Sequence, residues 1–164
     1  MDREHKDVLA YVEVSDGKPV NVGLELLTCA RSIADGAGGK VLAVLIGSGL
    51  DAAVKKVAAS GVDRVIVVTD PAYTAFRQDE YTSVLERLIR RYEPAVVLTG
   101  NTPLSIGLAP RLAARFQSGC VADVTSVRRE NGRLTWVTTR YCGTVLANEV
   151  ITNSALQFAT VRPG

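Results

Sequence analysis

The sequence predicts a three-layer α/β fold with a doubly wound, mostly parallel sheet and a C-terminal antiparallel meander. Short apolar runs without polar alternation, such as Val41–Ile46 and Ala95–Leu98, are typical of parallel strands covered on both faces. Segments with helical periodicity separate these runs, as in a sheet with helices on both sides. After Val121 the helical segments stop and strand-like runs follow one another across turn signals, which indicates antiparallel strands.

Length and composition exclude several classes of protein. A chain of 164 residues with 47% hydrophobic and 22% charged residues is typical of one soluble globular domain. The net charge of +2 and the aromatic share of 5% give no support to nucleic-acid binding. The charged start M-D-R-E-H-K-D is no signal peptide, and no apolar run is long enough to insert into a membrane.

The cysteines indicate a cytoplasmic protein. Cys29, Cys120 and Cys142 lie far apart, without the C-x-x-C spacing of a redox or zinc motif. An odd, sparse set of this kind is typical of reduced thiols rather than of a disulfide framework.

Each element can be assigned from its periodicity and its flanking residues. Glycines at 36, 38, 39 and 61 and Pro94 end helical segments, and Glu130-Asn131-Gly132 is a hairpin turn signal. The predicted helices are Val22–Ala34 capped by Asn21, Leu50–Ser60, Glu80–Arg91 and Leu104–Phe116. The predicted strands are Val8–Val14, Val41–Ile46, Arg64–Val68, Ala95–Leu98 and Val121–Val127, with Leu134–Tyr141, Val145–Thr152 and Leu156–Val161 in the meander.

The segment from Ala95 to Val124 organises the prediction. Its helix places Leu104, Leu108, Leu112 and Phe116 four residues apart, as one apolar stripe against the sheet. Thr102 is predicted to cap this helix, with Pro103 at its first position. The turn that precedes it follows the carboxyl end of a strand, where open parallel sheets bind their ligands.

Two turns are candidate nucleotide-binding sites. Gly47, Ser48, Gly49 and Asp51 open a helix after a buried strand, a context in which backbone N–H groups bind phosphate. This turn faintly resembles the S-G-G-x-D-S loop of ATP pyrophosphatases, but Gly47 and Ala52 stand where that loop has serines. The P-loop lysine is also missing. A structural turn capped by Ser48 or Asp51 is the favoured alternative.

The second turn contains Gly100, Asn101 and Thr102. It could surround an anion in the same way, but Pro103 removes one backbone donor and no lysine or arginine lies in the turn. A purely structural turn is at least as well supported.

No catalytic residue and no metal ligand is predicted. The only histidine, His5, lies in the charged N-terminal segment, whereas a catalytic base needs a fixed position. Without clustered cysteines there is no zinc site either. Asp79, Glu80 and Glu86 are interpreted as a helix cap and helix surface. Tyr73, Phe76 and Tyr81 are interpreted as packing under a long loop, with a partner surface as the alternative.

Motifs along essentially all 164 residues resemble the N-terminal domain of the electron transfer flavoprotein alpha subunit, in that family's order. Two are fairly specific, G-L-A-P-R-L-A-A-R-F at Gly107–Phe116 with A-D-V-T at Ala122–Thr125, and Q-F-A-T-V-R-P-G at Gln157–Gly164. The others are L-E-L-L-T-C-A-R at Leu24–Arg31, I-G-S-G-L-D-A-A at Ile46–Ala53 and A-S-G-V-D-R-V at Ala59–Val65.

The chain departs from the family pattern in two places. T-G-N-T-P-L-S-I precedes Gly107, where the family usually has a glycine-rich segment followed by an arginine. Cys142-Gly143-Thr144 replaces a double glycine and an asparagine in the late hairpin. Both departures concern local contacts.

The resemblance implies an adenine nucleotide alpha hydrolase-like fold over residues 1–164, as a single domain. In this family the FAD lies mainly on a C-terminal domain that follows the V-R-P-G segment, so none is expected on this chain. The resemblance also implies a non-catalytic scaffold that pairs with a beta subunit and works with flavin dehydrogenases through the complex. The alternative is a stand-alone module of the same fold that binds AMP or ATP.

A domain that pairs with a subunit should expose apolar surface at the interface. The candidates are Trp136, Val137, Tyr141, Val145 and Leu146 in the late strands. The isolated chain would then self-associate through this face or bind a cognate beta subunit. The equally weighted alternative for Trp136 is burial within its own domain.

Overall fold

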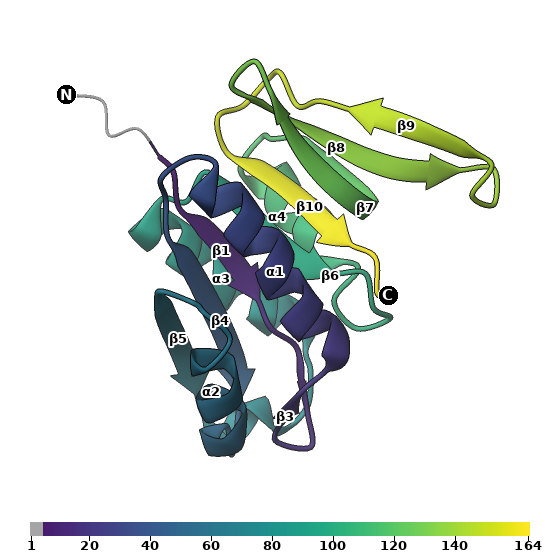
Figure 1. Ribbon diagram of the computed structural model, residues 1–164. Coiled ribbons are helices and arrows are strands. Elements are labelled where there is room, and N and C mark those ends of the chain that lie inside the picture. The colour runs from purple at the N-terminus through teal and green to yellow at the C-terminus, as the bar shows by residue number, and fades with distance from the viewer. Residues whose placement is uncertain (1–4) are drawn as a thin grey trace.

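The structure is a computed structural model that describes residues 5–164. Apart from the small hairpin of β2 and β3, helices and strands alternate from β1 to β7, as predicted (Figure 1). The helices are α1 (Asn21–Asp35), α2 (Asp51–Ala58), α3 (Gln78–Tyr92) and α4 (Leu108–Arg115), with a short 3-10 helix at Pro71–Thr74. The strands are β1 (Val8–Tyr11), β2 (Val14–Ser15), β3 (Lys18–Pro19), β4 (Val41–Gly47), β5 (Arg64–Thr69), β6 (Val96–Gly100), β7 (Cys120–Glu130), β8 (Arg133–Arg140), β9 (Val145–Glu149) and β10 (Gln157–Val161).

The main sheet is mostly parallel and confirms the predicted fold class. Its eight strands follow the order β5-β4-β1-β6-β10-β7-β8-β9, and every pairing from β5 to β7 is parallel. β8 and β9 continue the sheet in antiparallel fashion. The fully buried β4 lies inside the sheet between β1 and β5, as its continuous apolar sequence predicts.

Helices cover both faces of the sheet and form its two apolar cores. α1 and α2 pack on one face and α3 and α4 on the other (Figure 1). Because side chains alternate along a strand, Val8 and Ala10 of β1 enter the first core while Leu9 and Tyr11 enter the second. The result is the three-layer arrangement expected from the sequence.

The predicted meander is wrong in its last strand. β10 lies between β6 and β7 and is parallel to both, so the antiparallel part of the sheet is only β7, β8 and β9. The physical reason is burial, since Phe158, Ala159 and Thr160 are enclosed on both faces. A strand with both faces covered belongs in the interior of the sheet.

α4 is shorter at its N-terminus than predicted. Leu108 and Leu112 are buried against the sheet as expected, but Leu104 is 48% exposed and does not belong to the stripe. Residues 103–107 form turns after a bend at Thr102. The Ser105 N–H donates to Thr102 Oγ1 at 3.1 Å, and Ser105 Oγ donates to the Gly100 carbonyl at 2.8 Å. Thr102 therefore caps this turn, whereas the helix begins after Gly107.

Smaller differences concern the ends of elements. Asn21 is the first residue of α1 and Val20 is its N-cap, so the predicted side-chain cap is wrong. β1 ends at Tyr11, and the chain then forms the small hairpin of β2 and β3. The β7–β8 turn is confirmed, with Asn131 and Gly132 at positive φ (51° and 79°) as a tight hairpin requires.

Candidate functional site

The carboxyl ends of β1 and β4 border a pocket of about 320 Å³. This is the small end of the range for ligand pockets, and its position is the one expected for a doubly wound sheet. Its walls come from the ends of both strands, the β2–β3 hairpin, the loop after β5, and α3. The lining residues include Tyr11, Glu13, Asp16, Gly17, Gly47, Ser48, Leu50, Tyr73, Phe76, Tyr81 and Leu104.

The predicted phosphate turn lies only partly in this pocket. Gly47 and Ser48 line it, whereas Gly49 and Asp51 do not. Gly49 has φ of 64°, a conformation that favours glycine, so this residue serves the tight turn into α2. The N-cap of α2 is Leu50 without any side-chain hydrogen bond, so the prediction that Ser48 or Asp51 caps the helix is wrong.

The charge in the pocket opposes an anion. Glu13 and Asp16 lie in the lining, and the lining residues of this part of the described chain include no lysine or arginine. Glu13 is nearly buried and its Oε2 accepts a hydrogen bond from Thr102 Oγ1. A phosphate here would face carboxylates in a partly desolvated site, which is electrostatically unfavourable.

Aromatic rings close the other side of the pocket. Tyr81 packs against Tyr73, Phe76 and Tyr11, with ring centroids 5.8, 4.8 and 6.2 Å away. Burial raises the pKa of the Tyr11 hydroxyl, and the neighbouring Tyr81 and Glu13 add to this effect. The Tyr81 hydroxyl donates to the Ile46 carbonyl at 3.4 Å. Packing under the loop, the default interpretation of these residues, is confirmed.

The second predicted turn is occupied by contacts within the protein. The Asn101 N–H donates to the Val161 carbonyl at 2.8 Å, and Asn101 Nδ2 donates to Asp123 Oδ1 at 2.8 Å. Thr160 Oγ1 donates to Asn101 Oδ1 at 3.4 Å. Gly100 forms the end of β6, and Thr102 donates to Glu13 as described above. These residues join neighbouring strands. Nothing in these contacts adds support to the prediction that the turn binds a nucleotide.

An ion pair that the sequence did not single out completes this network. Arg162 Nε donates to Asp123 Oδ1 at 2.9 Å, and Arg162 Nη2 donates to Asp123 Oδ2. The arginine is the main reason why the pKa of the Asp123 carboxyl lies below its usual range. Asp123 belongs to A-D-V-T and Arg162 to V-R-P-G, so the two most family-specific regions meet here. Spacing along the chain could not have shown this contact.

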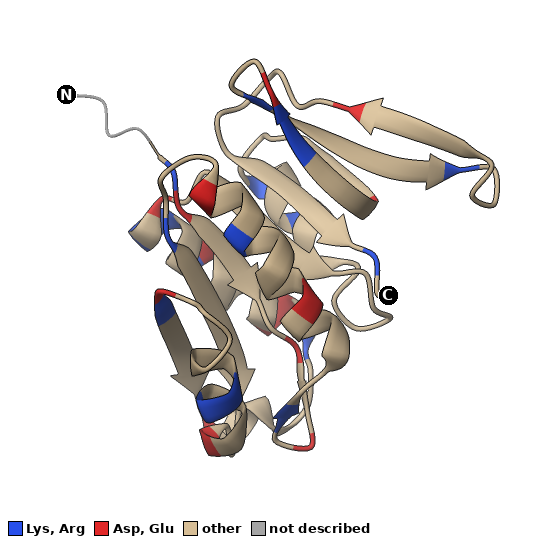
Figure 2. Ribbon diagram, viewed as in Figure 1, with Lys and Arg blue, Asp and Glu red and all other residues tan. Residues whose placement is uncertain are grey.

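The other charged candidates make structural contacts. Asp79 pairs with Arg111, while Glu86 pairs with Arg90 and with Arg115 at 2.6 Å, so these carboxylates tie α3 to α4. The N-cap of α3 is Arg77, so none of the three predicted acidic residues caps that helix. Figure 2 shows positive and negative residues interspersed along the ribbon.

His5, the remaining candidate residue, makes a contact within the protein. The His5 Nδ1–H donates to the Glu93 carbonyl at 2.7 Å, which gives this exposed residue a structural contact. Within residues 5–164, no group of three or more His, Cys, Asp or Glu side chains gathers in a way that could hold a metal ion. No helix in that range has both the length and the apolar sequence needed to cross a bilayer.

The hairpin of β8 and β9 extends away from the body of the domain (Figure 1). At its outer end Tyr141 is 81% and Leu146 67% exposed, and Val145 is also exposed. Trp136 and Val137 are buried instead, so their assignment to an exposed interface is wrong. Burial of Trp136 within its own domain, the alternative interpretation, is confirmed.

Comparison with known proteins connects this geometry to a family. The family model described as "Electron transfer flavoprotein domain" matches residues 8–164. The chain is 35% identical to the electron transfer flavoprotein subunit alpha of Thermoanaerobacterium thermosaccharolyticum over 98% of this chain and 49% of the relative. It is 31% identical to the Bacillus subtilis protein of that name, over 96% of this chain and 48% of the relative.

A third relative has a different name. The chain is 33% identical to the lactate dehydrogenase (NAD(+),ferredoxin) subunit LctC of Acetobacterium woodii, over 96% of this chain and 38% of that subunit. The chain thus spans about half the length, or less, of these relatives.

Proposed function

Because the chain belongs to the electron transfer flavoprotein domain family, we propose that it is the N-terminal scaffold and heterodimerisation domain of an alpha subunit. Through the assembled complex it would support electron transfer between flavin dehydrogenases and their acceptors. The domain itself would have no catalytic site, in keeping with relatives named as electron transfer flavoprotein subunits.

The observation that carries this proposal is the projecting β8–β9 hairpin. Tyr141, Val145 and Leu146 present exposed apolar side chains at its outer end. Exposed apolar groups that lie together on one surface are typical of sites that bind another protein. A specific pairing with a beta subunit would bury roughly 1,200 Å² or more in total.

The carboxyl-end pocket does not fit the diphosphate of FAD, because Glu13 and Asp16 line it without a compensating cation among the described lining residues. We therefore propose that residues 1–164 do not themselves hold the flavin. The same carboxylates argue against a stand-alone AMP- or ATP-binding module that would use this pocket. The isolated chain should be colourless after gel filtration, whereas a flavin absorption band at near-stoichiometric occupancy would contradict this assignment.

A cytoplasmic location is part of the proposal. Cys29, Cys120 and Cys142 are all free thiols. Burial raises the pKa of the Cys29 thiol and of the Cys120 thiol to about 11, so both are protonated and unreactive at neutral pH.

The heterodimer can be tested by titrating the chain with its separately produced cognate beta subunit in analytical ultracentrifugation. The Leu146→Asp variant places a charge in the proposed interface and should weaken the pairing by about tenfold or more. Val67→Asp is the control, because Val67 is also an exposed apolar residue and lies on the opposite edge strand β5. The proposal would be contradicted if the chain did not bind the beta subunit, or if the two variants weakened binding equally.

A further inference from the structure

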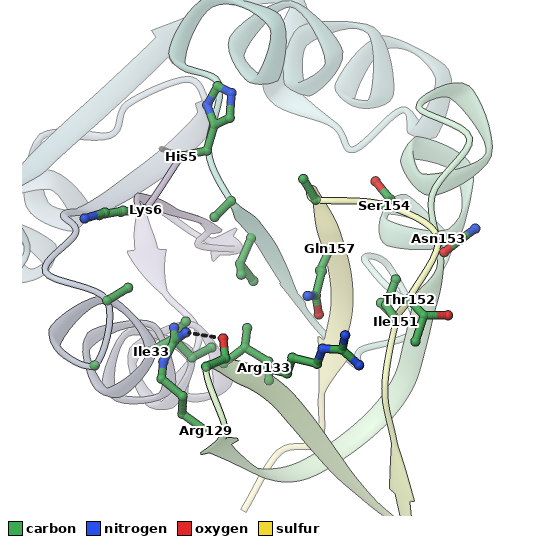
Figure 3. Close-up of a pocket in the computed structure, with 17 residues that line it drawn as sticks. His5, Lys6, Ile33, Arg129, Arg133, Ile151, Thr152, Asn153, Ser154 and Gln157 are labelled. Carbon is green, nitrogen blue, oxygen red and sulfur yellow. Dashed lines mark hydrogen bonds between the residues drawn. The ribbon is translucent and has the colours of Figure 1, made fainter. Parts of the chain in front are cut away.

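A second and larger cavity lies at the opposite end of the sheet, beside the amino ends of β6 and β10. Its volume is about 800 Å³. Five separate segments line it, namely the lead into β1, the end of α1, the start of β6, the β7–β8 turn, and the loop between β9 and β10 with the start of β10 (Figure 3). Segments far apart in the sequence are thus brought together around one space, of a size that suits a small organic molecule.

The lining of this cavity is basic. Lys6, Arg129 and Arg133 line it together with His5, and the described residues of the lining include no aspartate or glutamate. A concave surface that carries one sign of charge focuses the electrostatic potential and concentrates counter-ions. The cavity therefore favours negatively charged ligands.

Arg129 and Arg133 differ from most arginines in the described chain. Eight other arginines each form an ion pair with a carboxylate. Examples are Arg31 with Asp63, and both Arg90 and Arg115 with Glu86. Within residues 5–164, neither of the two cavity arginines does so. Arg129 Nη1 donates only to the Gly132 carbonyl at 3.2 Å, and no hydrogen bond involves the Arg133 side chain. Their positive charges are not neutralised locally and face the cavity.

A neutral donor is held in place beside these cations. Trp136 Nε1–H can only donate, and it contacts Gln157 Oε1 at 2.9 Å. Because the indole is fully buried, this contact fixes the orientation of the Gln157 amide. The amide NH₂ then turns away from Trp136 and toward the cavity, where Figure 3 shows the Gln157 and Arg133 side chains on the same wall.

The remaining wall is apolar. Ile33 of α1, Leu134 of β8 and Ile151 after β9 all line the cavity. Leu134 and Ile33 belong to the main core, so this wall is rigid. The cavity thus combines two arginines without a carboxylate partner among the described residues, one oriented amide donor and a hydrophobic surface, which is the combination found in sites for small organic anions.

We propose that this cavity binds a small organic anion, a phosphate monoester or a carboxylate. Its charged group lies against Arg133 and the Gln157 amide, with Arg129 on the other side of the cavity, and its apolar part lies against Ile33, Leu134 and Ile151 (Figure 3). Both anions share the geometry that a planar guanidinium recognises with paired hydrogen bonds. The site is separate from the hairpin surface, so it stands whether or not the domain pairs with a beta subunit.

The chain provides its own reporter for a test. Trp136 is the only tryptophan, and its indole N–H contacts the lining residue Gln157, so one ¹H–¹⁵N resonance reports on the cavity. The labelled chain is titrated at constant ionic strength with phenyl phosphate, benzoate, inorganic phosphate and phenol. We expect a saturable shift of the indole resonance with phenyl phosphate or benzoate, a weaker one with inorganic phosphate, and none with phenol.

Matched variants test the role of the arginines. Arg133→Gln should weaken the binding of the preferred anion by about tenfold or more, because it removes a charge-assisted hydrogen bond. Arg129→Gln should act in the same direction and serves as the second variant. Arg87→Gln is the control, since Arg87 is also exposed but lies on α3 outside the cavity. Far-UV circular dichroism verifies that each variant is folded.

The outcomes are distinct. Saturation by phenyl phosphate alone assigns a phosphate ester to the site, and saturation by benzoate alone assigns a carboxylate. The proposal is overturned if no anion gives a saturable shift, if phenol acts as strongly as the anions, or if Arg87→Gln weakens binding as much as Arg133→Gln.

Discussion

The pockets at the two ends of the sheet differ in charge and in volume, and the polar side chains at the two ends make different contacts. At the carboxyl end a pocket of about 320 Å³ is lined by Glu13 and Asp16. At the amino end a cavity of about 800 Å³ is lined by Lys6, Arg129 and Arg133. Open parallel sheets bind ligands at their carboxyl ends, so the usual rule points to the smaller, acidic pocket.

The difference in charge between the two ends arises from the turns and hairpins that flank the parallel strands. Asn101 and Asp123 at the carboxyl end form hydrogen bonds and an ion pair that join β6, β7 and β10. At the amino end the β7–β8 turn brings Arg129 and Arg133 over the start of β10 without carboxylate partners among the described residues. The location of a binding site therefore depends on the charges that hairpins and loops contribute, and the topology of the sheet alone does not decide it.

The largest expected effect is at the amino end. Trp136→Ala should lower the free energy of unfolding by about 3–5 kcal/mol, because the indole is fully buried and its loss also leaves Gln157 unpaired. Urea denaturation measures this change. Tyr141→Ala on the same hairpin is the control and should stay within about 0.5 kcal/mol, since Tyr141 is exposed. A cost for Trp136→Ala below about 1 kcal/mol would contradict the burial of this side chain.

A comparable change can be made on α4, the helix that follows the carboxyl end of β6 in the chain. Leu112→Ala should cost about 2–5 kcal/mol, because Leu112 lies on the buried face of α4. Leu104→Ala should cost less than about 0.5 kcal/mol, as Leu104 lies in the turn before that helix and is half exposed. Chemical denaturation of both variants compares them directly. Equal losses would show that the helix extends to Leu104, as the sequence alone suggests.

A smaller effect depends on pH. Arg162 lowers the pKa of the folded-state Asp123 carboxyl, so the pair stabilises the fold fully above the unfolded pKa of about 3.9. This stabilisation is lost as the pH falls through the lower folded-state pKa. Asp123→Asn should cost about 1 kcal/mol at pH 7, because the pair is partly exposed.

The difference between Asp123→Asn and the unmodified chain should shrink below about pH 4, as the carboxyl becomes protonated. Unfolding curves at pH 7, 5, 4 and 3 would show this trend. Asp63 and Glu86 also have lowered pKa values, and they contribute equally to both proteins. A difference that stays constant with pH would mean that Arg162 does not stabilise the ionised carboxylate.

The smallest expected effect concerns nucleotides at the carboxyl end. AMP and phenyl phosphate should leave the amide resonances of Gly47, Ser48 and Gly49 unchanged, because Glu13 and Asp16 repel their phosphates. The same spectra contain the Trp136 indole resonance, so the two ends are compared in one sample. A saturable shift of the Gly47–Gly49 amides by AMP would instead favour the nucleotide-binding alternative.

Much of the fold could be predicted because local sequence and burial agree. The continuous apolar run of Val41–Ile46 predicts a strand covered on both faces, and β4 is such a strand. Asn131-Gly132 predicts a tight hairpin turn because both residues tolerate positive φ, and both have it. The stripe of Leu108 and Leu112 predicts the buried face of α4. In each case the residues that set the structure are neighbours in the chain.

Tertiary structure alone decided the rest. The final strand lies between β6 and β7 because only there are both faces of Phe158 covered, and pairing between distant strands leaves no local signal. Trp136 is buried because Gln157 and the core enclose it, although its own strand permits either face. Asp123 and Arg162, like the arginines of the amino-end cavity, acquire their surroundings from segments far away in sequence. Local pattern determines which residues form strands and helices, whereas long-range packing determines which charges meet, and therefore where a ligand or partner can bind.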